Sequence, residues 1–225
     1  MRRLAFAALL LAASCGPAAG PRARIPRESR AGAGRLHRFR VEVSAAPAEI
    51  RHDRTLKEIS RMPGAAGNGL KTQGLSTIKH SMATQTRFST AKGSKEVYAW
   101  FDDVIMEVAI SSVIIHIPKE YAPGSCEYQI VLEHERGHGR AARETAVVFA
   151  GKLEAALGAA TGVPTRFDPV ITTDFATAAE KLREAIASIV DPVYDQYELD
   201  EAEAQRRLDR PDPYDAVYKK CDGWR

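Results

Sequence analysis

The chain has 225 residues, with 32 lysines and arginines against 29 aspartates and glutamates, for a formal net charge of +3. This near balance argues against nucleic acid as a partner, because chains that bind nucleic acid are usually strongly basic. The length is sufficient for one domain with a hydrophobic core, and the sequence contains no internal repeat.

The first 14 residues have the pattern of a bacterial secretion signal. Arg2 and Arg3 form a positively charged start, and the apolar stretch 4–13 is too short to span a bilayer. The residues around Cys15 resemble a lipobox, which would make this cysteine the lipidated first residue, while ordinary cleavage near residues 18–20 is the alternative. Either outcome predicts an exported protein of the periplasm, or a lipoprotein of the outer membrane.

Residues 15–34 are rich in proline, glycine, alanine and arginine, which predicts a tether without a core. Its positive charge could hold it near anionic lipid head groups. Without residues 1–14 the formal charge falls to +1, so the mature chain is nearly neutral. The folded domain is expected over residues 35–225.

Strands are predicted in the first half of this domain. Phe39, Val41 and Val43 alternate with charged residues, as in a half-buried strand. The β-branched stretches 104–110 and 113–117 are separated by two serines and predict a pair of antiparallel strands. Short strands are also expected at residues 84–89 and 96–101, and a helical turn at 54–61.

A long helix is predicted from Ser125, a suitable N-cap, to residue 157, because no proline interrupts this stretch. It contains the pentapeptide His134-Glu135-Arg136-Gly137-His138. Residues four apart share a helix face, so both imidazoles could bind one metal ion, with Glu135 beside them as general base. This is the His-Glu-x-x-His arrangement of zinc hydrolases. The alternative is a surface helix that carries two histidines by chance.

Helices are predicted after the motif. One begins near Asp174 and has an apolar stripe, which Pro192 is expected to kink or break. A last helix runs to about Leu208, shortly before Pro211. Because strands come first and helices follow, the predicted fold class is α+β, with a small antiparallel or mixed sheet.

A catalytic zinc site normally has three protein ligands, and no histidine follows His138. Glu201 falls within the apolar stripe of the last helix, where a carboxylate needs a partner or a metal ion. We therefore predict His134, His138 and Glu201 as ligands of Zn²⁺, with Glu135 as the catalytic residue. An ion pair of Glu201 is the alternative, and Asp215 and Asp222 are alternative ligands.

The chain has three cysteines, and Cys15 is either lipidated or removed with the signal. The oxidising cell envelope would pair the other two, Cys126 and Cys221, in a disulfide. Two free buried thiols are the alternative. The disulfide would bring the C-terminal tail, with Asp215 and Asp222, close to the motif helix.

The order of elements resembles the zincin architecture, in which a sheet is followed by the metal helix and a backing helix. In zincins the strand before the metal helix, here residues 113–117, aligns an extended substrate by strand addition. More narrowly, the run from Gly124 to Tyr128, followed by Leu132 to Glu135 and His138, resembles bacterial envelope proteins of unknown function that share a metallopeptidase motif. The C-terminal histidine of those proteins has no counterpart here.

The resemblance and the motif together indicate a zinc-dependent metallopeptidase or related hydrolase of the cell envelope. Its substrate would be a peptide or protein, with peptidoglycan-linked peptides among the candidates. One tyrosine, Tyr197, Tyr214 or Tyr218, could stabilise the oxyanion. The alternative function is a non-catalytic envelope lipoprotein that uses a zincin-like scaffold for metal binding or protein interaction.

Overall fold

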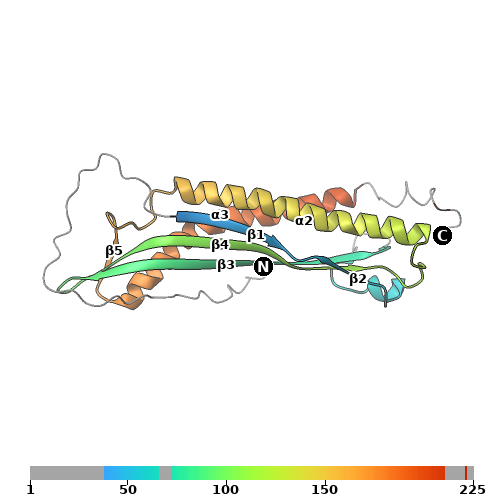
Figure 1. Cartoon of the computed structure of the whole chain (residues 1–225), viewed down its shortest axis with the longest axis horizontal. Helices are drawn as coiled ribbons and strands as arrows, with labels where there is room; N and C mark the ends of the chain where they lie inside the picture. Colours follow the sequence, from blue (N-terminus) through green and yellow to red (C-terminus); the bar gives the residue numbers. More distant parts are fainter. Residues whose placement is uncertain (1–37, 66–71, 211–220, 222–225) are drawn as a thin grey trace. The chain divides into compact units, whose positions relative to one another are not determined.

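A computed structural model describes residues 38–65, 72–210 and Cys221, and Figure 1 shows its helices and strands. The described residues form two compact units. Unit 1 contains residues 38–42, 83–107 and 153–192, and unit 2 contains residues 43–65, 72–82, 108–152 and 193–210 and Cys221. The predicted signal (1–14) and tether (15–34) lie outside the described residues.

The five described strands form one mixed sheet, in which β4 pairs with each of the others. β2 runs parallel to β4, whereas β5 runs antiparallel to it. The sheet is therefore mixed, and not the antiparallel alternative. The strands are β1 (Arg38–Ala45), β2 (Ala48–Arg51), β3 (Leu75–Lys92), β4 (Val97–His116) and β5 (Val170–Thr172).

The described residues also form three helices, and the α+β class is confirmed. They are α1 (Leu56–Ile59), α2 (Cys126–Ala159) and α3 (Phe175–Leu208). The expected helical turn near residues 54–61 is α1. None of the described helices combines the length and the apolar character that a membrane crossing requires.

The prediction of two strands at 104–110 and 113–117 is wrong, because β4 continues through Ser111 and Ser112. Even-numbered residues such as Val108 and Ile110 are buried before the serines, and odd-numbered residues such as Val113 and Ile115 after them. A strand can change its buried side in this way through one extra residue, without a turn. The predicted strands 84–89 and 96–101 are likewise parts of the longer β3 and β4.

The end of β4 is not a free edge for strand addition, contrary to the expectation taken from zincins. Ala48 to Arg51 of β2 pair with Val113 to His116 of β4, and β3 also pairs with β4. An extended substrate could not form a ladder with residues whose backbone groups already belong to the sheet.

α3 is one helix, although Pro192 was expected to kink or break it. Proline in a helix interior removes one backbone hydrogen bond and costs about 3 kcal/mol. Residues on both sides of it are well buried, since Val190 is 2% and Tyr197 5% exposed. Burial along α3 therefore outweighs the local cost of the proline. Its start agrees with the prediction, because the Asp174 carboxylate accepts a hydrogen bond from the Thr177 N–H.

The core of unit 2 lies where α2 packs on the end of β4. Ile115 and Ile117 from the strand side contact Val131 and Leu132 of α2, and all four are buried. This packing fixes which face of α2 turns toward the sheet. It therefore also fixes where the polar residues of the motif point.

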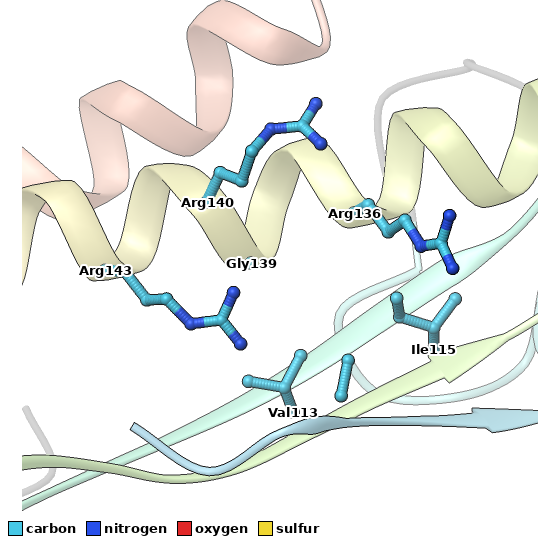
Figure 2. A pocket seen from close by; sticks show the side chains of 7 residues that line it. Val113, Ile115, Arg136, Gly139, Arg140 and Arg143 are labelled. Carbon is cyan, nitrogen blue, oxygen red and sulfur yellow. The ribbon is translucent and has the colours of Figure 1, made fainter. Parts of the chain in front are cut away.

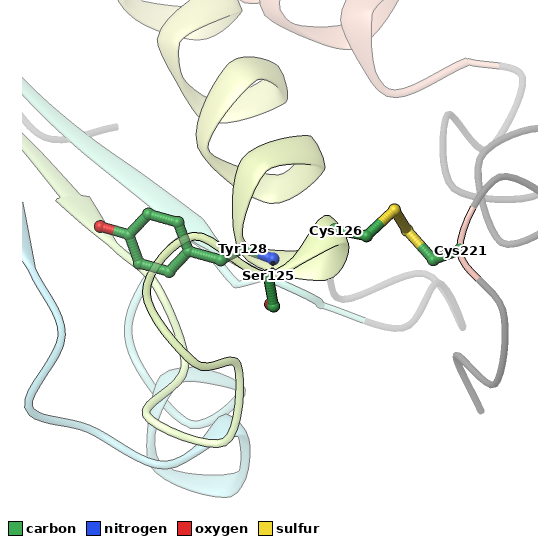
Figure 3. The surroundings of a disulfide bond; sticks show 4 residues. All are labelled: Ser125, Cys126, Tyr128 and Cys221. Carbon is green, nitrogen blue, oxygen red and sulfur yellow. Dashed lines mark hydrogen bonds between the residues drawn. A yellow bond between two sulfur atoms is a disulfide. The ribbon is translucent and has the colours of Figure 1, made fainter.

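The start of α2 is held in two ways (Figure 3). The Ser125 hydroxyl accepts a hydrogen bond from the Tyr128 N–H at 3.2 Å, as expected of an N-cap. Cys126 forms a disulfide with Cys221, as predicted, and so attaches the C-terminal part of the chain to the first turn of α2. Asp215 and Asp222 themselves lie outside the described residues.

Candidate metal centre

The two motif histidines lie one turn apart on α2 with their rings close together. The ring centroids are 4.8 Å apart, and the Nε2 atoms of His134 and His138 are separated by 3.1 Å. Their neighbours Val131 and Ala142 are fully buried, so α2 cannot rotate without exposing its apolar face. The histidine pair is therefore held in place by the core.

The third member of the group is Asp209, which directly follows the end of α3. Its Oδ1 atom lies 3.4 Å from His134 Nε2 and 3.2 Å from His138 Nε2. Leu208 brings the end of α3 against Gly137 of α2, where a Cβ would lie at an ordinary contact distance of 3.7 Å from the Leu208 side chain. Asp209 is about half exposed (47%), so the group faces solvent on this side.

The spacing of these three donor atoms fits a single metal ion. Ligands about 2.0–2.1 Å from a tetrahedral zinc are about 3.3–3.4 Å apart. The three separations here are 3.1, 3.2 and 3.4 Å. Two imidazole nitrogens and one carboxylate oxygen are also a donor set that zinc accepts, with a fourth position left for water or substrate.

Gln205 orients the His138 ring by a hydrogen bond at Nδ1, the ring nitrogen that does not face His134 and Asp209. Its Nε2 donates to the His138 carbonyl oxygen at 3.3 Å and to Glu201 Oε1 at 3.0 Å, which leaves its Oε1 as an acceptor. His138 Nδ1 lies 2.6 Å from that oxygen and therefore donates to it. With the proton on Nδ1, the Nε2 lone pair of His138 is free for a metal, which is the usual support of a ligating histidine.

Glu201 is not a member of the group, contrary to our choice of it as third ligand. Its Oε1 lies 3.5 Å from His80 Nε2 and accepts a hydrogen bond from Gln205. These hydrogen bonds lower the pKa of Glu201, with the contact to His80 as the largest cause. Glu201, which we selected because it falls in the apolar stripe, therefore supports the site through Gln205. The alternative that we considered, an ion pair of Glu201, is made with His80.

Four polar residues at intervals of four follow one face of α3 to the site: Tyr197, Glu201, Gln205 and Asp209. The Tyr197 hydroxyl is 2.9 Å from His80 Nδ1, so this tyrosine contacts His80. Burial raises the pKa of Tyr197, which keeps its hydroxyl protonated. Tyr214 and Tyr218, the other tyrosines considered for the oxyanion, lie outside the described residues.

Sequence reasoning missed Asp209, although the spacing of these four residues could have made it a candidate beside Glu201. Glu201 was judged by its place among apolar residues. The same spacing of four, continued past the end of the apolar stripe, passes through Gln205 to Asp209. The row predicts one continuous polar face, with Asp209 at its exposed end.

Glu135 is buried between α2 and the start of β3, and only 3% of it is exposed. Gly74 provides the space, because a Cβ at this position would lie 2.9 Å from Glu135 Oε1 and 2.4 Å from Val131 Cγ1. The Ser76 hydroxyl donates to the Glu135 carbonyl oxygen at 2.8 Å, which ties β3 to this turn of the helix. Burial raises the pKa of Glu135, while His138 and His134 oppose this effect.

Without a metal ion, the electrostatics of the site favour a charged pair of Asp209 and His138, so a metal ion would have to displace the proton from His138 Nε2. Burial alone would lower the pKa of His138, but the contacts with Asp209, Glu135 and Gln205 raise it. Burial alone would raise the pKa of Asp209, but hydrogen bonds with both histidines hold it far below its usual range. The carboxylate of Asp209 is therefore ionised, as a metal ligand must be.

No protein-family model, curated protein or solved structure matches this chain, so the function of the site is argued from its own geometry.

Proposed function

We propose that this chain is a zinc-dependent metallopeptidase, or a related hydrolase, of the bacterial cell envelope. The observation that carries the proposal is the spacing of His134 Nε2, His138 Nε2 and Asp209 Oδ1, which agrees with three ligands of one zinc ion. The position of Glu135 next to His134 supports it further, since this is where such hydrolases have their base. The secretion signal pattern supports the location.

When bound, zinc would supply Lewis-acid activation of a water molecule and of the scissile carbonyl. The Glu135 carboxylate would accept the proton of that water and later donate it to the leaving amine. A carboxylate whose pKa is raised by burial suits this role, because it must hold the proton between the two steps. Gln205 would keep the His138 ring in one tautomer throughout.

The substrate class follows from the proposed location. An exported hydrolase would meet envelope proteins and peptidoglycan-linked peptides, and both contain amide bonds of the kind that such a site could cleave. The N-terminal lipid, if Cys15 is acylated, would attach the enzyme to the membrane through the predicted tether.

A second candidate function is metal binding without catalysis, as in an interaction module of the envelope. The observation that favours it is the burial of Glu135, which is 3% exposed with Gly74 against its carboxylate. A base in this position needs a path for water from the side of Asp209. If there is no such path, the same residues form a structural metal site.

The test begins with the metal content of protein purified without chelators, for which we expect one zinc per chain. The zinc-loaded protein is then assayed for cleavage of a mixed peptide library and of peptidoglycan fragments. Cleavage that stops when zinc is removed and returns when it is added supports the enzyme. Zinc without cleavage of either substrate class supports the second candidate, and absence of zinc contradicts both.

A further inference from the structure

A cationic cavity lies on the flank of α2 away from the metal centre. Each residue turns a helix by about 100°, so Arg136 lies about 200° around the axis from His134. Arg136, Arg140 and Arg143 follow at intervals of four and three and therefore share a face. Together with Gly139 and residues of β2 and β4 they line a cavity of about 270 Å³. We call it the arginine cavity.

The positive charge of the arginine cavity is only partly neutralised. The described residues that line the cavity include three arginines and no carboxylate. Arg140 forms an ion pair with Glu133, in which both side chains are more than half exposed. Arg143 donates to the carbonyl oxygen of Ala46 at 3.2 Å, and within the described part of the chain Arg136 has no hydrogen bond or ion pair. Two guanidinium groups therefore keep donors for an outside anion.

The floor of the arginine cavity is apolar. It consists of Val113 and Ile115 of β4 and Ala48 of β2. Figure 2 shows the guanidinium groups of Arg136 and Arg143 extending toward these strands, whereas that of Arg140 extends away from them. Val113 and Ile115 are themselves only 2% and 0% exposed, so the aliphatic surface open to a ligand is that of Ala48 and Ile50 on β2. A ligand between Arg136 and Arg143 could contact the guanidinium groups and this surface at the same time.

The acidic residue nearest in sequence on β2 does not reach into the cavity. Alternate residues of a strand point to opposite faces, so Glu49 and Arg51 lie on the face opposite Ala48. They pair with each other at 2.7 Å. Ile50 shares the face of Ala48 and is 40% exposed, which extends the apolar floor toward solvent.

We propose that the arginine cavity binds the carboxylate of a small aliphatic ligand, in the first place the C-terminal residue of a peptide with a Leu-, Ile- or Val-like side chain. The guanidinium group of arginine matches the two oxygens of a carboxylate, and the aliphatic group would cover the exposed side chains of Ala48 and Ile50 on β2. Free phosphate would also pair with the arginines, but it would leave these aliphatic side chains exposed. The volume of about 270 Å³ suits one residue more than a larger ligand. This binding requires neither zinc nor the proposed hydrolysis.

The probe for this proposal is N-acetyl-leucine, titrated into the isotopically labelled full chain and followed by NMR. For about 12 heavy atoms we expect a Kd of about 1 mM. N-acetyl-leucinamide, which lacks the charge, and acetate and inorganic phosphate, which lack the aliphatic group, should each bind at least about tenfold more weakly. Equal binding of the amide, tighter binding of phosphate, or no saturable binding of N-acetyl-leucine would each overturn the proposal.

Variants locate the binding. Arg136→Gln and Arg143→Gln should each weaken N-acetyl-leucine at least about tenfold, whereas Arg140→Gln should have an effect below about threefold. Arg183→Gln, which removes an arginine of α3 that pairs with Glu180, is the matched control and should have no effect. Arg136→Lys keeps the charge without the fork, and it should give an intermediate Kd even if the glutamine variant folds poorly. Equal effects of all four glutamine variants would place the ligand elsewhere.

A blocking variant tests the cavity without changing its charge. A Cβ at position 139 would lie 3.5 Å from Val113 Cγ1, an ordinary contact, so Gly139→Ala should fold and bind nearly as the wild type. Gly139→Met would occupy the floor and should abolish binding of N-acetyl-leucine. Unchanged binding in Gly139→Met contradicts the proposal, provided that its circular dichroism and zinc content match those of Gly139→Ala.

Discussion

Three side chains form the proposed metal site, and different parts of the chain hold them. His134 and His138 are fixed by the apolar face of α2, while Asp209 depends on the end of α3. Gln205 connects the two helices, because it contacts both His138 and Glu201. These roles predict different effects for residues that are close in sequence.

Substitution of Asp209 by alanine should weaken zinc binding more than any other change on α3 or just after it. It removes a ligand, whereas Glu201→Ala removes only support of Gln205, for which a loss of about 10–100-fold is usual. Asp209→Ala should exceed that loss. Competition of each purified variant with a chelator of known zinc affinity measures the difference.

Glu203→Ala is the control for both substitutions, because Glu203 pairs with Arg206 and Arg207 at the surface. Its zinc affinity should equal that of the wild type. A larger loss in Glu201→Ala than in Asp209→Ala would return Glu201 to the metal and remove Asp209 from it.

Glu135→Gln should retain zinc and lose hydrolysis by about 10²–10⁴-fold, because an amide cannot accept the proton. The change keeps the shape of the side chain in its space beside Gly74. Turnover of a substrate cleaved by the wild type, measured in zinc-loaded protein, gives the result. Glu133→Gln, an exposed neighbour that pairs with Arg140, should leave turnover unchanged. Full activity of Glu135→Gln would show that another group is the base.

At the level of elements, the start of β3 is the part that holds Glu135 in position. Gly74 lies against Val131 and Glu135, and Ser76 donates to the backbone of α2. At position 74 the chain therefore lies so close to α2 that any side chain there would overlap with Val131 and Glu135. This contact explains a glycine directly before a long strand.

Gly74→Ala should lower the free energy of unfolding by about 1–3 kcal/mol, because its Cβ would lie 2.4 Å from Val131 Cγ1 and force the packing to shift. Denaturant unfolding measures it. Gly151→Ala is the matched control: position 151 is an exposed site inside α2 where a Cβ meets nothing within 4 Å. This change should raise stability by about 0.5–1 kcal/mol. A neutral Gly74→Ala would mean that β3 and α2 are less tightly packed there.

At the level of the whole molecule, the disulfide between Cys126 and Cys221 joins the start of α2 to the end of the chain, 95 residues apart. The two segments that form the metal centre, α2 and the end of α3, both lie within this loop. The disulfide therefore lowers the conformational entropy of the unfolded chain over the whole region that forms the metal centre.

Replacement of Cys126 and Cys221 by serine should lower the free energy of unfolding by about 4–5 kcal/mol, as the chain-entropy model gives for a loop of 95 residues. Denaturant unfolding of metal-free protein separates this effect from zinc binding. Titration of denatured, unreduced protein should find neither cysteine free. Two reactive thiols in addition to any unmodified Cys15 would contradict the bond.

The sequence by itself determined the parts that depend on local spacing. The helix that carries His134, Glu135 and His138 follows from its composition and N-cap, and the proximity of the two rings follows from a separation of four residues. The disulfide followed from the count of cysteines in an exported chain. The α+β class followed from the order of elements.

The tertiary structure decided what depends on contacts between distant segments. Asp209 could not be separated from Glu201 by sequence alone, since both lie on one row of α3 and only the docking of α3 against α2 shows which end reaches the histidines. β4 continues through Ser111 and Ser112 because neighbouring strands pair with β4 both before and after the two serines. α3 continues through Pro192 because burial on either side outweighs the cost of the proline. In β4 and α3 a local preference is overruled by packing that the sequence pattern does not express, and at the metal centre the choice of ligand depends on how the two helices pack.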